Sequence, residues 1–490
     1  MDKHCKNLPS PLLSAVPIII LVGLLFVTIR TFGGDALTGG SQIVLLTSTA
    51  VTSMLAMIFC KIKWECIERA ICQNVLGVST ALIILLLIGA LSGSWMVSGI
   101  VPTMIYYGMQ IIHPSFFLAT SCIICAVVSI MTGSSWTTIA TIGVALMGIG
   151  EAQGFSTGWV AGAIISGAYF GDKVSPLSDT TVLASSVTET PLFSHIRYMA
   201  YTTVPSLIIT LILFVLMGFG HPSEASDQIA VYASSLKDTF FISPWLMVVP
   251  VITAILIAKK VPSLITLFVS CVMAGICAIL FQPDLLSQIA GNDVTGGTAL
   301  FKGTFITYYG STSIETGNAS LNELVTTRGM AGMLSTIWLI ICAMCFGGSM
   351  QASGMLESLT SLFVRFMKKG LGMVSSTVCS GLFLNLVTAD QYISIILTGN
   401  MFKEVYKKNG YESCLLSRTT EDAVTVTSVL IPWNSCGMTQ STILGVPTLT
   451  YLPYCFFNLL SPLMSIFIMA IGFKIRRLKV ETEVSDGAVS

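Results

Sequence analysis

The sequence contains few charged residues, no excess of either sign and few histidines. Only 10% of its 490 residues are Asp, Glu, Lys or Arg, against roughly 25% in an ordinary soluble domain. Lys and Arg number 24, as do Asp and Glu, so the net charge does not indicate a nucleic acid as partner. The four histidines form no metal-ligand cluster, and no GxSxG or HExxH motif occurs. These absences argue against an enzyme, a cofactor and a resident metal ion.

Long apolar runs make up most of the chain. Hydrophobic residues account for 53% of it, and a bilayer core of about 30 Å requires roughly 20 of them in one helix. The first run is too long for the hydrophobic region of a signal peptide, and no small-residue cleavage site follows it, so we interpret it as the first span. We therefore predict an all-α polytopic protein of the lipid bilayer with about 11–13 membrane segments, some of them broken or re-entrant. The predicted spans lie near residues 11–30, 41–60, 71–92, 95–112, 115–131, 157–171, 199–219, 244–258, 262–281, 331–350, 370–387, 415–445 and 450–473.

Positive charges predict which side of the membrane each loop occupies, because cytoplasmic loops are enriched in Lys and Arg. Residues 31–40, 221–243 and 282–330 are poor in these residue types. The pattern predicts that both termini lie in the cytoplasm. The residues that carry this prediction are Lys3, Lys6, Lys61, Lys63, Arg69, Lys259, Lys260, Lys368, Lys369, Lys403, Lys407, Lys408, Lys474, Arg476, Arg477 and Lys479.

Two parts of the chain resemble each other. Residues 94–99 (SWMVSG) match residues 349–354 (SMQASG) at an offset of 255, and each stretch closes one apolar helix and opens another. The same offset takes Ser135 to Asp390, which lies in a comparable polar break. Because polar breaks as well as apolar runs fall in register, we interpret the match as an internal repeat.

A second break supports the repeat. Residues 175–180 match residues 431–436 at an offset of 256. The charge pattern starts the first unit on the cytoplasmic side and the second on the outside, so the units are predicted to be inverted, as in many secondary transporters. The predicted organisation is an N-terminal hairpin (1–70), repeat 1 with a hairpin tip and a broken helix (71–198), connecting helices with an outside loop (199–330), repeat 2 with the same parts (331–473) and a cytoplasmic tail (474–490).

The polar breaks of the first unit are predicted to form the site, because backbone groups freed within a membrane must find partners or line a wet cavity. Residues 132–138 (TGSSWTT) suit the tip of a re-entrant hairpin. The second break, residues 171–181, contains Pro176, which frees a carbonyl one turn earlier. It also contains Asp179, and a carboxylate among hydroxyls can hold either Na⁺ or H⁺. The expected coordinating residues are Ser134, Ser135, Thr137, Ser175, Ser178 and Thr180, with Asp172 as a further acidic group.

The second unit carries the matching breaks at residues 385–392 and 428–437. The latter has no carboxylate, so neutral oxygens would serve there. The candidates in these breaks are Thr388, Asp390, Asn434 and Ser435. Arg418, Glu421 and Asp422 precede the last break, and charges inside a membrane are functional candidates because they are costly unless paired or hydrated.

Structural roles remain open for several of these residues. Asp172 can simply lie at a helix end. Arg418 with Glu421 or Asp422 has the spacing of a helical ion pair. Asp390 can cap a helix.

Three long motifs make the sequence recognisable. GDKVSPLSDTTVLAS at 171–185, TADQYISIILTGNMF at 388–402 and SRTTEDAVTVTSVLIPWNSCG at 417–437 resemble the hallmarks of the NhaC-type Na⁺/H⁺ antiporter family. The resemblance spans nearly the whole chain. It implies the plan of the wider ion transporter superfamily, with inverted repeats, a re-entrant hairpin in each repeat and, in many members, a homodimer. By analogy the site would be formed by the hairpin tips 133–138 and 388–392 with the breaks 175–181 and 431–437.

The function we predict is Na⁺/H⁺ antiport by alternating access. Asp179 would be the carboxylate shared by Na⁺ and H⁺, with Asp390 and Asp422 as second acidic groups. The alternative is a Na⁺- or H⁺-coupled carrier of a small organic acid, such as malate or lactate, or of an amino acid. The same family includes such exchangers, and the counter-charges would be Lys173, Arg418 and Glu421. A channel is disfavoured by the broken-helix plan, and an intramembrane enzyme by the missing catalytic motifs.

Overall fold

The computed structural model describes residues 8–32, 39–176, 178–219, 233–259, 261–291, 293–317, 322, 325–365 and 370–478. Several of the charges that predict the orientation lie outside these residues, namely Lys3, Lys6, Lys260, Lys368, Lys369 and Lys479. So do most of the predicted C-terminal tail and parts of the loops at 31–40, 221–243 and 282–330.

The described chain is helical, which confirms the predicted all-α class. Eight helical segments are long and apolar enough to cross a bilayer: α1 (Pro11–Phe32), α2 (Gly40–Phe59), α3 (Trp64–Val97), α5 (Phe117–Thr132) with the turn before it from Pro114, α10 (Leu192–Phe219), α13 (Ser263–Phe281), α17 (Gly329–Ala352) and α19 (Leu371–Thr388). Two bent helix pairs, with angles of 89° and 56°, raise the number to ten. The predicted 11–13 segments also include the regions near 95–112, 157–171 and 415–445. The helices there are too short, too broken or too polar to count as spans by length and composition.

Large apolar side chains cover the outside of the long helices. Ile19 and Phe26 on α1, Ile212 on α10 and Phe268 on α13 are all more than half exposed. Soluble monomers rarely expose such continuous apolar surface. Many serines and threonines are buried instead. The molecule therefore has the surface of a multi-pass membrane protein.

The two repeats are visible in the order of the elements. After α3, Gly99 with φ of 82° precedes α4 (Ile100–Ile111); after α17, Gly354 with φ of 69° precedes α18 (Met355–Arg365). A helical hairpin follows in each half. It consists of α5 with α6 (Ser135–Thr138), η3 (Ile139–Gly143) and α7 (Val144–Ala152) in the first half, and of α19 with α20 (Gln391–Lys408) in the second.

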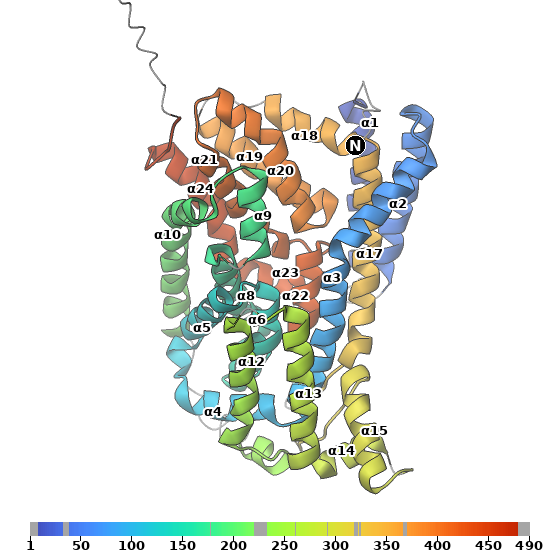
Figure 1. Cartoon of the computed structure of the whole chain (residues 1–490), viewed down its shortest axis with the longest axis vertical. Coiled ribbons are helices and arrows are strands. Elements are labelled where there is room, and N and C mark those ends of the chain that lie inside the picture. The colour runs from blue at the N-terminus through green and yellow to red at the C-terminus, as the bar shows by residue number, and fades with distance from the viewer. Residues whose placement is uncertain are drawn as a thin grey trace, which may run out of the picture.

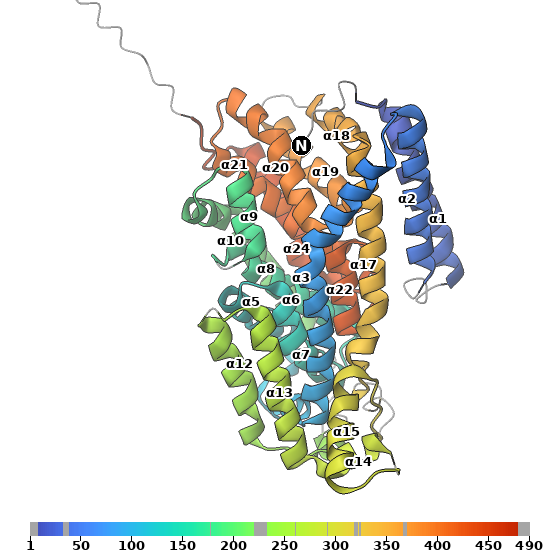
Figure 2. The same cartoon turned by 45° about the vertical axis from the view of Figure 1, so that its right-hand side comes forward.

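A broken helix comes next in each half. In the first half it is formed by α8 (Thr157–Val174) and α9 (Asp179–Val187). In the second it is formed by α21 (Ser413–Thr420), η5 (Glu421–Thr425), η6 (Ser428–Leu430) and α22 (Ser435–Leu444). α3 and α17 pack along each other and run in opposite directions in Figures 1 and 2, so the two halves are inverted. The predicted boundaries at residues 70 and 198 fall inside α3 and α10.

Hydrogen bonds recur at nearly constant offset in the two halves. Thr132 Oγ1 donates to the carbonyl oxygen of Ser134 at 3.1 Å, and Thr388 Oγ1 donates to that of Asp390 at 3.0 Å. This pattern pairs Ser134 with Asp390, at an offset of 256. The prediction that Ser135 matches Asp390 is therefore wrong by one residue.

Helix α20 was not predicted as a span. Its last turns carry Lys403, Glu404, Lys407 and Lys408, so hydropathy alone does not reveal it. The remaining elements connect or flank the repeats: η2 (Pro114–Phe116), η4 (Pro244–Met247), α12 (Val248–Ala258), α14 (Pro283–Ala290), α15 (Gly296–Tyr309), α23 (Thr448–Tyr451), η7 (Leu452–Tyr454) and α24 (Phe456–Ile471). Of these, α24 packs against α8 and α10 beside the first broken helix.

Candidate functional site

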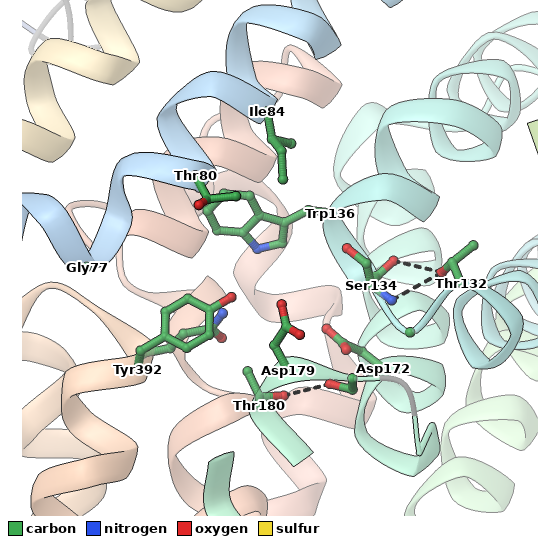
Figure 3. A pocket seen from close by; sticks show the side chains of 13 residues that line it. Gly77, Thr80, Ile84, Thr132, Ser134, Trp136, Asp172, Asp179, Thr180 and Tyr392 are labelled. Carbon is green, nitrogen blue, oxygen red and sulfur yellow. Dashed lines mark hydrogen bonds between the residues drawn. The ribbon is translucent and has the colours of Figure 1, made fainter. Parts of the chain in front are cut away.

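A polar cavity of about 340 Å³ lies where the first hairpin tip, the first broken helix, α3 and the start of α20 meet. Figure 3 shows the carboxylates of Asp172 and Asp179 side by side in it, with the rings of Trp136 and Tyr392 nearby. The cavity is lined by Gly77, Thr80, Ile84, Thr132, Gly133, Ser134, Trp136, Asp172, Ser178, Asp179, Thr180, Gln391 and Tyr392. Both halves of the molecule thus contribute to one site.

The first hairpin tip is a turn of two residues, Gly133 and Ser134, between α5 and α6. Gly133 takes a left-handed conformation, with φ of 65°, that ends α5 without the steric cost of a side chain. Ser134 then caps α6, because its Oγ accepts a hydrogen bond from the backbone nitrogen of Thr137 at 3.2 Å. Thr132 Oγ1 accepts from the Ser134 nitrogen at 3.1 Å and closes the turn. The tip therefore presents hydroxyl oxygens to the cavity.

The first broken helix supplies the two carboxylates. Asp172 lies in the last turn of α8, where its Oδ2 accepts hydrogen bonds from Ser135 Oγ at 2.6 Å and from the Ser135 nitrogen at 3.1 Å. Asp179 begins α9 and is exposed to the cavity. Among the described residues its carboxylate has no recorded hydrogen-bond or ion-pair partner. Ser178 Oγ and Thr180 Oγ1, which also line the cavity, are 3.0 Å apart. One carboxylate is thus held by the hairpin, and the other is available to a ligand.

Three of the predicted coordinating residues of this half stay outside the lining. Ser135 lies behind the tip and holds Asp172. Thr137 Oγ1 donates to Ser134 Oγ at 3.2 Å, and Ser175 Oγ donates to the carbonyl oxygen of Ile130 at 2.8 Å. All three contribute to the shape of the site without facing the cavity.

The predicted residues of the second half meet one another instead. Asp390 is buried, and its Oδ1 accepts from the Ile393 nitrogen at 3.0 Å as the cap of α20. Its Oδ2 accepts from Ser435 Oγ at 3.1 Å. Asn434 Nδ2 donates to the carbonyl oxygen of Asn385 at 3.0 Å. Thr388, next to the tip, bonds within the turn. None of these residues lines the cavity. Asp390 caps a helix, which is the structural role left open for it by the sequence.

The predicted charged residues form a separate buried group behind the cavity. Lys173 Nζ pairs with Asp422 Oδ1, which also accepts from Thr202 Oγ1 at 3.1 Å and Ser461 Oγ at 3.2 Å. Arg418 Nε is 4.0 Å from Asp422 Oδ2. Of the two helical ion pairs considered for Arg418, the structure therefore shows the one with Asp422. Glu421 is adjacent and fully buried.

Several lining residues were missed by the sequence analysis. Gly77, Thr80 and Ile84 lie on α3. The local sequence of α3 offers only a weak signal there, the neighbouring Ser79 and Thr80 in an apolar run. Trp136, Gln391 and Tyr392 lie inside the predicted polar breaks but were not proposed as ligands.

Two inverted repeats, each with a hairpin and a broken helix, around a polar cavity within an apolar helical protein define a secondary transporter. Residues 167–473 match the model of the Na⁺/H⁺ antiporter family, and the chain belongs to this family. It is 36% identical over 429 residues to the Na⁺/H⁺ antiporter NhaC of Bacillus subtilis (strain 168), covering 87% of this chain and 91% of that one.

Other relatives carry different names. The malate-2H⁺/Na⁺-lactate antiporter of Bacillus subtilis (strain 168) is 36% identical over 439 residues, covering 89% of this chain and 90% of that one. The arginine/ornithine antiporter ArcD of Halobacterium salinarum (strain ATCC 700922 / JCM 11081 / NRC-1) is 32% identical over 491 residues, covering 99% of this chain and 97% of that one. Among solved structures, the Alcanivorax borkumensis YdaH transporter aligns with 95% of this chain and 99% of its own at 11% identity, with a TM-score of 0.38 that is too low to inform the fold.

Proposed function

We propose that this protein exchanges Na⁺ for H⁺ across the bacterial inner membrane by alternating access, and that it is not an enzyme. The observation that carries the proposal is the placement of Asp172 and Asp179 at one cavity together with the oxygens of Ser134, Ser178 and Thr180. Carboxylate and hydroxyl oxygens are the ligands that a hard cation prefers. Carboxylates also bind protons, so the two ions compete for the same groups.

The geometry of the cavity supports competition between Na⁺ and H⁺ for the same carboxylates, rather than passive flow of ions through a channel. Asp179 has no recorded partner among the described residues, so an ion can replace water at its oxygens without breaking a protein bond. Asp172 is held by the hairpin tip through Ser135. Binding of Na⁺ at both carboxylates would therefore act on the tip and on the break together, which are the parts that alternating access must move.

A cytoplasmic location of both termini is supported by the charge distribution. The connection between α2 and α3, the end of α20 and the end of α24 lie at the same end of the molecule, at the top of Figure 1. They carry Lys61 and Lys63, Lys407 and Lys408, and Arg476. By the rule that cytoplasmic loops are positive, this end faces the cytoplasm.

A second candidate function is Na⁺- or H⁺-coupled transport of a small organic solute. A cavity of about 340 Å³ has room for more than one dehydrated ion. Its described lining contains two carboxylates and two large aromatic rings but no Lys, Arg or His. Such a lining favours an organic cation over an organic acid, because aromatic faces and carboxylates both attract positive charge. Lys173 and Arg418, the predicted counter-charges for an acid, do not reach the cavity.

The test uses purified protein in liposomes that contain a trapped pH dye. Na⁺ is added outside, followed in separate experiments by arginine, ornithine, malate and lactate. Proton movement triggered by Na⁺ alone is the expected result. If protons move only when an organic solute is present, the second candidate replaces the first, and the charge of the effective solute identifies its class.

A further inference from the structure

Four charged side chains form a buried group behind the cavity, which we call the rear cluster: Lys173, Arg418, Glu421 and Asp422. Each is fully buried. Lys173 follows Asp172 on the last turn of α8, so the same turn joins the cavity to the rear cluster. Any charge that enters the cavity is therefore close to this cluster.

Asp422 is held by several donors, all of them on one of its carboxylate oxygens. Its Oδ1 accepts from Lys173, Thr202 and Ser461, and Lys173 Nζ in turn donates to Ser461 Oγ at 3.0 Å. A buried carboxylate with this many donors is stable as an anion. Asp422 and Lys173 thus form a buried ion pair.

Glu421 and Arg418 differ from that pair. Among the described residues, neither carboxylate oxygen of Glu421 and none of the three guanidinium nitrogens of Arg418 has a hydrogen-bond partner. Thr425, one turn after Glu421, also has an unpaired hydroxyl. A guanidinium is always charged, and Arg418 rests 4.6 Å from the centre of the Tyr198 ring and 4.0 Å from Asp422 Oδ2. A fully buried carboxylate without a hydrogen-bond donor is very unfavourable, so this geometry favours the neutral acid at Glu421.

The net charge of the rear cluster depends on whether Glu421 carries a proton. With Glu421 neutral, the two cations Lys173 and Arg418 face the single anion Asp422. When Glu421 loses its proton, the cluster becomes neutral. Arg418 lies three residues earlier on the same helical stretch, which is the spacing of a side-chain ion pair. Arg418 therefore supplies a counter-charge for the deprotonated state.

Charged groups on the other elements around Glu421 are few. Asp172 and Lys173 of α8 lie close enough to act on it electrostatically, and α9 begins with Asp179 at the cavity. α19 and α24, which also pack against η5, carry no Asp, Glu, Lys or Arg. The charges of α20 lie in its last turns, from Lys403 onward. α10 contributes His195, whose Nδ1 bonds to Ser417 Oγ at 2.7 Å.

We propose, on the basis of the Na⁺/H⁺ exchange proposed above, that Glu421 is a proton-carrying residue separate from the Na⁺ site. It holds a proton when the cavity contains no Na⁺ and releases it when Na⁺ binds at Asp172 and Asp179, because a cation in the cavity opposes a proton nearby. The released charge is then balanced by Arg418. Glu421 touches no Na⁺ and acts on coupling alone.

The experiment compares proton-coupled and proton-independent fluxes in proteoliposomes. Glu421→Gln keeps the shape of the side chain and removes the carboxyl group that binds and releases the proton. Its ²²Na⁺/Na⁺ exchange is expected to stay within about threefold of wild type, since the Na⁺ ligands are intact. The number of protons moved per Na⁺ is expected to fall by about one. The KM for Na⁺ should also decrease less with rising pH than in wild type. Glu421→Asp is expected to restore proton movement in part, with a displaced pH profile.

Glu404→Gln, the same substitution at an exposed position of α20, is the matched control and should match wild type throughout. An unchanged proton-to-Na⁺ ratio and pH profile in Glu421→Gln would overturn the proposal. So would loss of both fluxes in Glu421→Gln and Glu421→Asp, since that result marks a purely structural residue. Wild-type protein that moves no protons in response to Na⁺ would instead contradict the proposed function, before any variant is compared.

Discussion

The two hairpin tips share a backbone and a hydrogen-bond pattern but place their carboxylates at opposite positions. In the first half the tip carries Ser134 and the break carries Asp179; in the second half the tip carries Asp390 and the break carries Ser435. At the offset of 256, each serine corresponds to an aspartate. Asp390 Oδ2 accepts from Ser435 Oγ at 3.1 Å. No bond is recorded between Ser134 and Asp179, and both face the cavity.

The framework behind the tips is the same in both halves. Ser129 Oγ donates to the carbonyl oxygen of Ala168 at 2.6 Å, and Asn385 Nδ2 donates to that of Val424 at the same distance. Both bonds join the first arm of the hairpin to the broken helix. Equivalent scaffolds thus hold two different serine–aspartate pairs: Ser134 and Asp179, which face the cavity, and Asp390 and Ser435, which bond to each other.

The difference indicates a division of labour between the halves. Asp390 lies outside the cavity lining and bonds to the protein through both of its carboxylate oxygens, so it would lose those bonds to bind an ion. A carboxylate exposed to a cavity has no such cost. We therefore expect the second tip to serve as a support, and the first tip with its break to bind the ion. Each prediction below tests this division.

The largest effect is expected from a matched pair, Asp179→Asn and Asp390→Asn. Removal of the Asp179 charge should lower Na⁺-driven proton movement by at least about tenfold, because a charged ligand contributes about 1.5–3 kcal/mol. Asp390→Asn should retain exchange within a few-fold, since Asn is an equally good helix cap. Pyranine fluorescence in proteoliposomes measures both. Equal losses in the two variants would contradict the division.

Moving the charge should have a nearly equal effect. Ser134→Asp combined with Asp179→Ser gives the first half the arrangement of the second without changing the number of carboxylates. We expect the tip to close as Asp390 and Ser435 do, with exchange lost and with thermal stability equal to wild type or higher by about 1 kcal/mol. The reverse pair in the second half, Asp390→Ser with Ser435→Asp, is the control and should still exchange. Wild-type transport in the first double variant would show that the position of the carboxylate does not matter.

Much of the fold could be predicted, because apolar length and repeated motifs are local properties. The helices α1, α2, α13 and α17 follow from hydropathy, and the inverted halves follow from two short matches and the loop charges. α20 could not be found in this way, since its last turns are charged and only its pairing with α19 places it in the fold.

The candidate site could be predicted in part. Ser134, Ser178, Thr180, Asp172 and Asp179 lie in polar breaks that are evident in the sequence, and they do line the cavity. The contribution of α3 depends on packing between distant segments. Gln391 and Tyr392 lie in a predicted break, but only packing brings them to the carboxylates of the first half. The contrast between Asp179 and Asp390 was equally hidden, because both occupy polar breaks and only the contact with Ser435 separates them.

A smaller effect is expected for the caps of the two tips. Ser134→Ala and Asp390→Ala each remove an N-cap, which should lower the free energy of unfolding by about 1 kcal/mol in both cases. Only Ser134→Ala should also raise the KM for Na⁺, since Ser134 lines the cavity and Asp390 does not. Thermal unfolding in detergent followed by size-exclusion chromatography gives the stability, and ²²Na⁺ uptake gives the KM. A raised KM in Asp390→Ala would move that residue into the transport site.

The smallest effect concerns the backbone that the tips share. Gly133 and Ala389 both adopt left-handed conformations, with φ of 65° and 56°, and only glycine does so without steric cost. Gly133→Ala should therefore destabilise the protein by about 1 kcal/mol. Ala389→Gly should stabilise the protein by less than that amount, because the added freedom of glycine in the unfolded chain offsets about 0.5–1 kcal/mol. Thermal unfolding shows whether each variant is less or more stable than wild type. If Gly133→Ala left stability unchanged, the first tip would not depend on this turn, and its equivalence to the second tip would rest on hydrogen bonds alone.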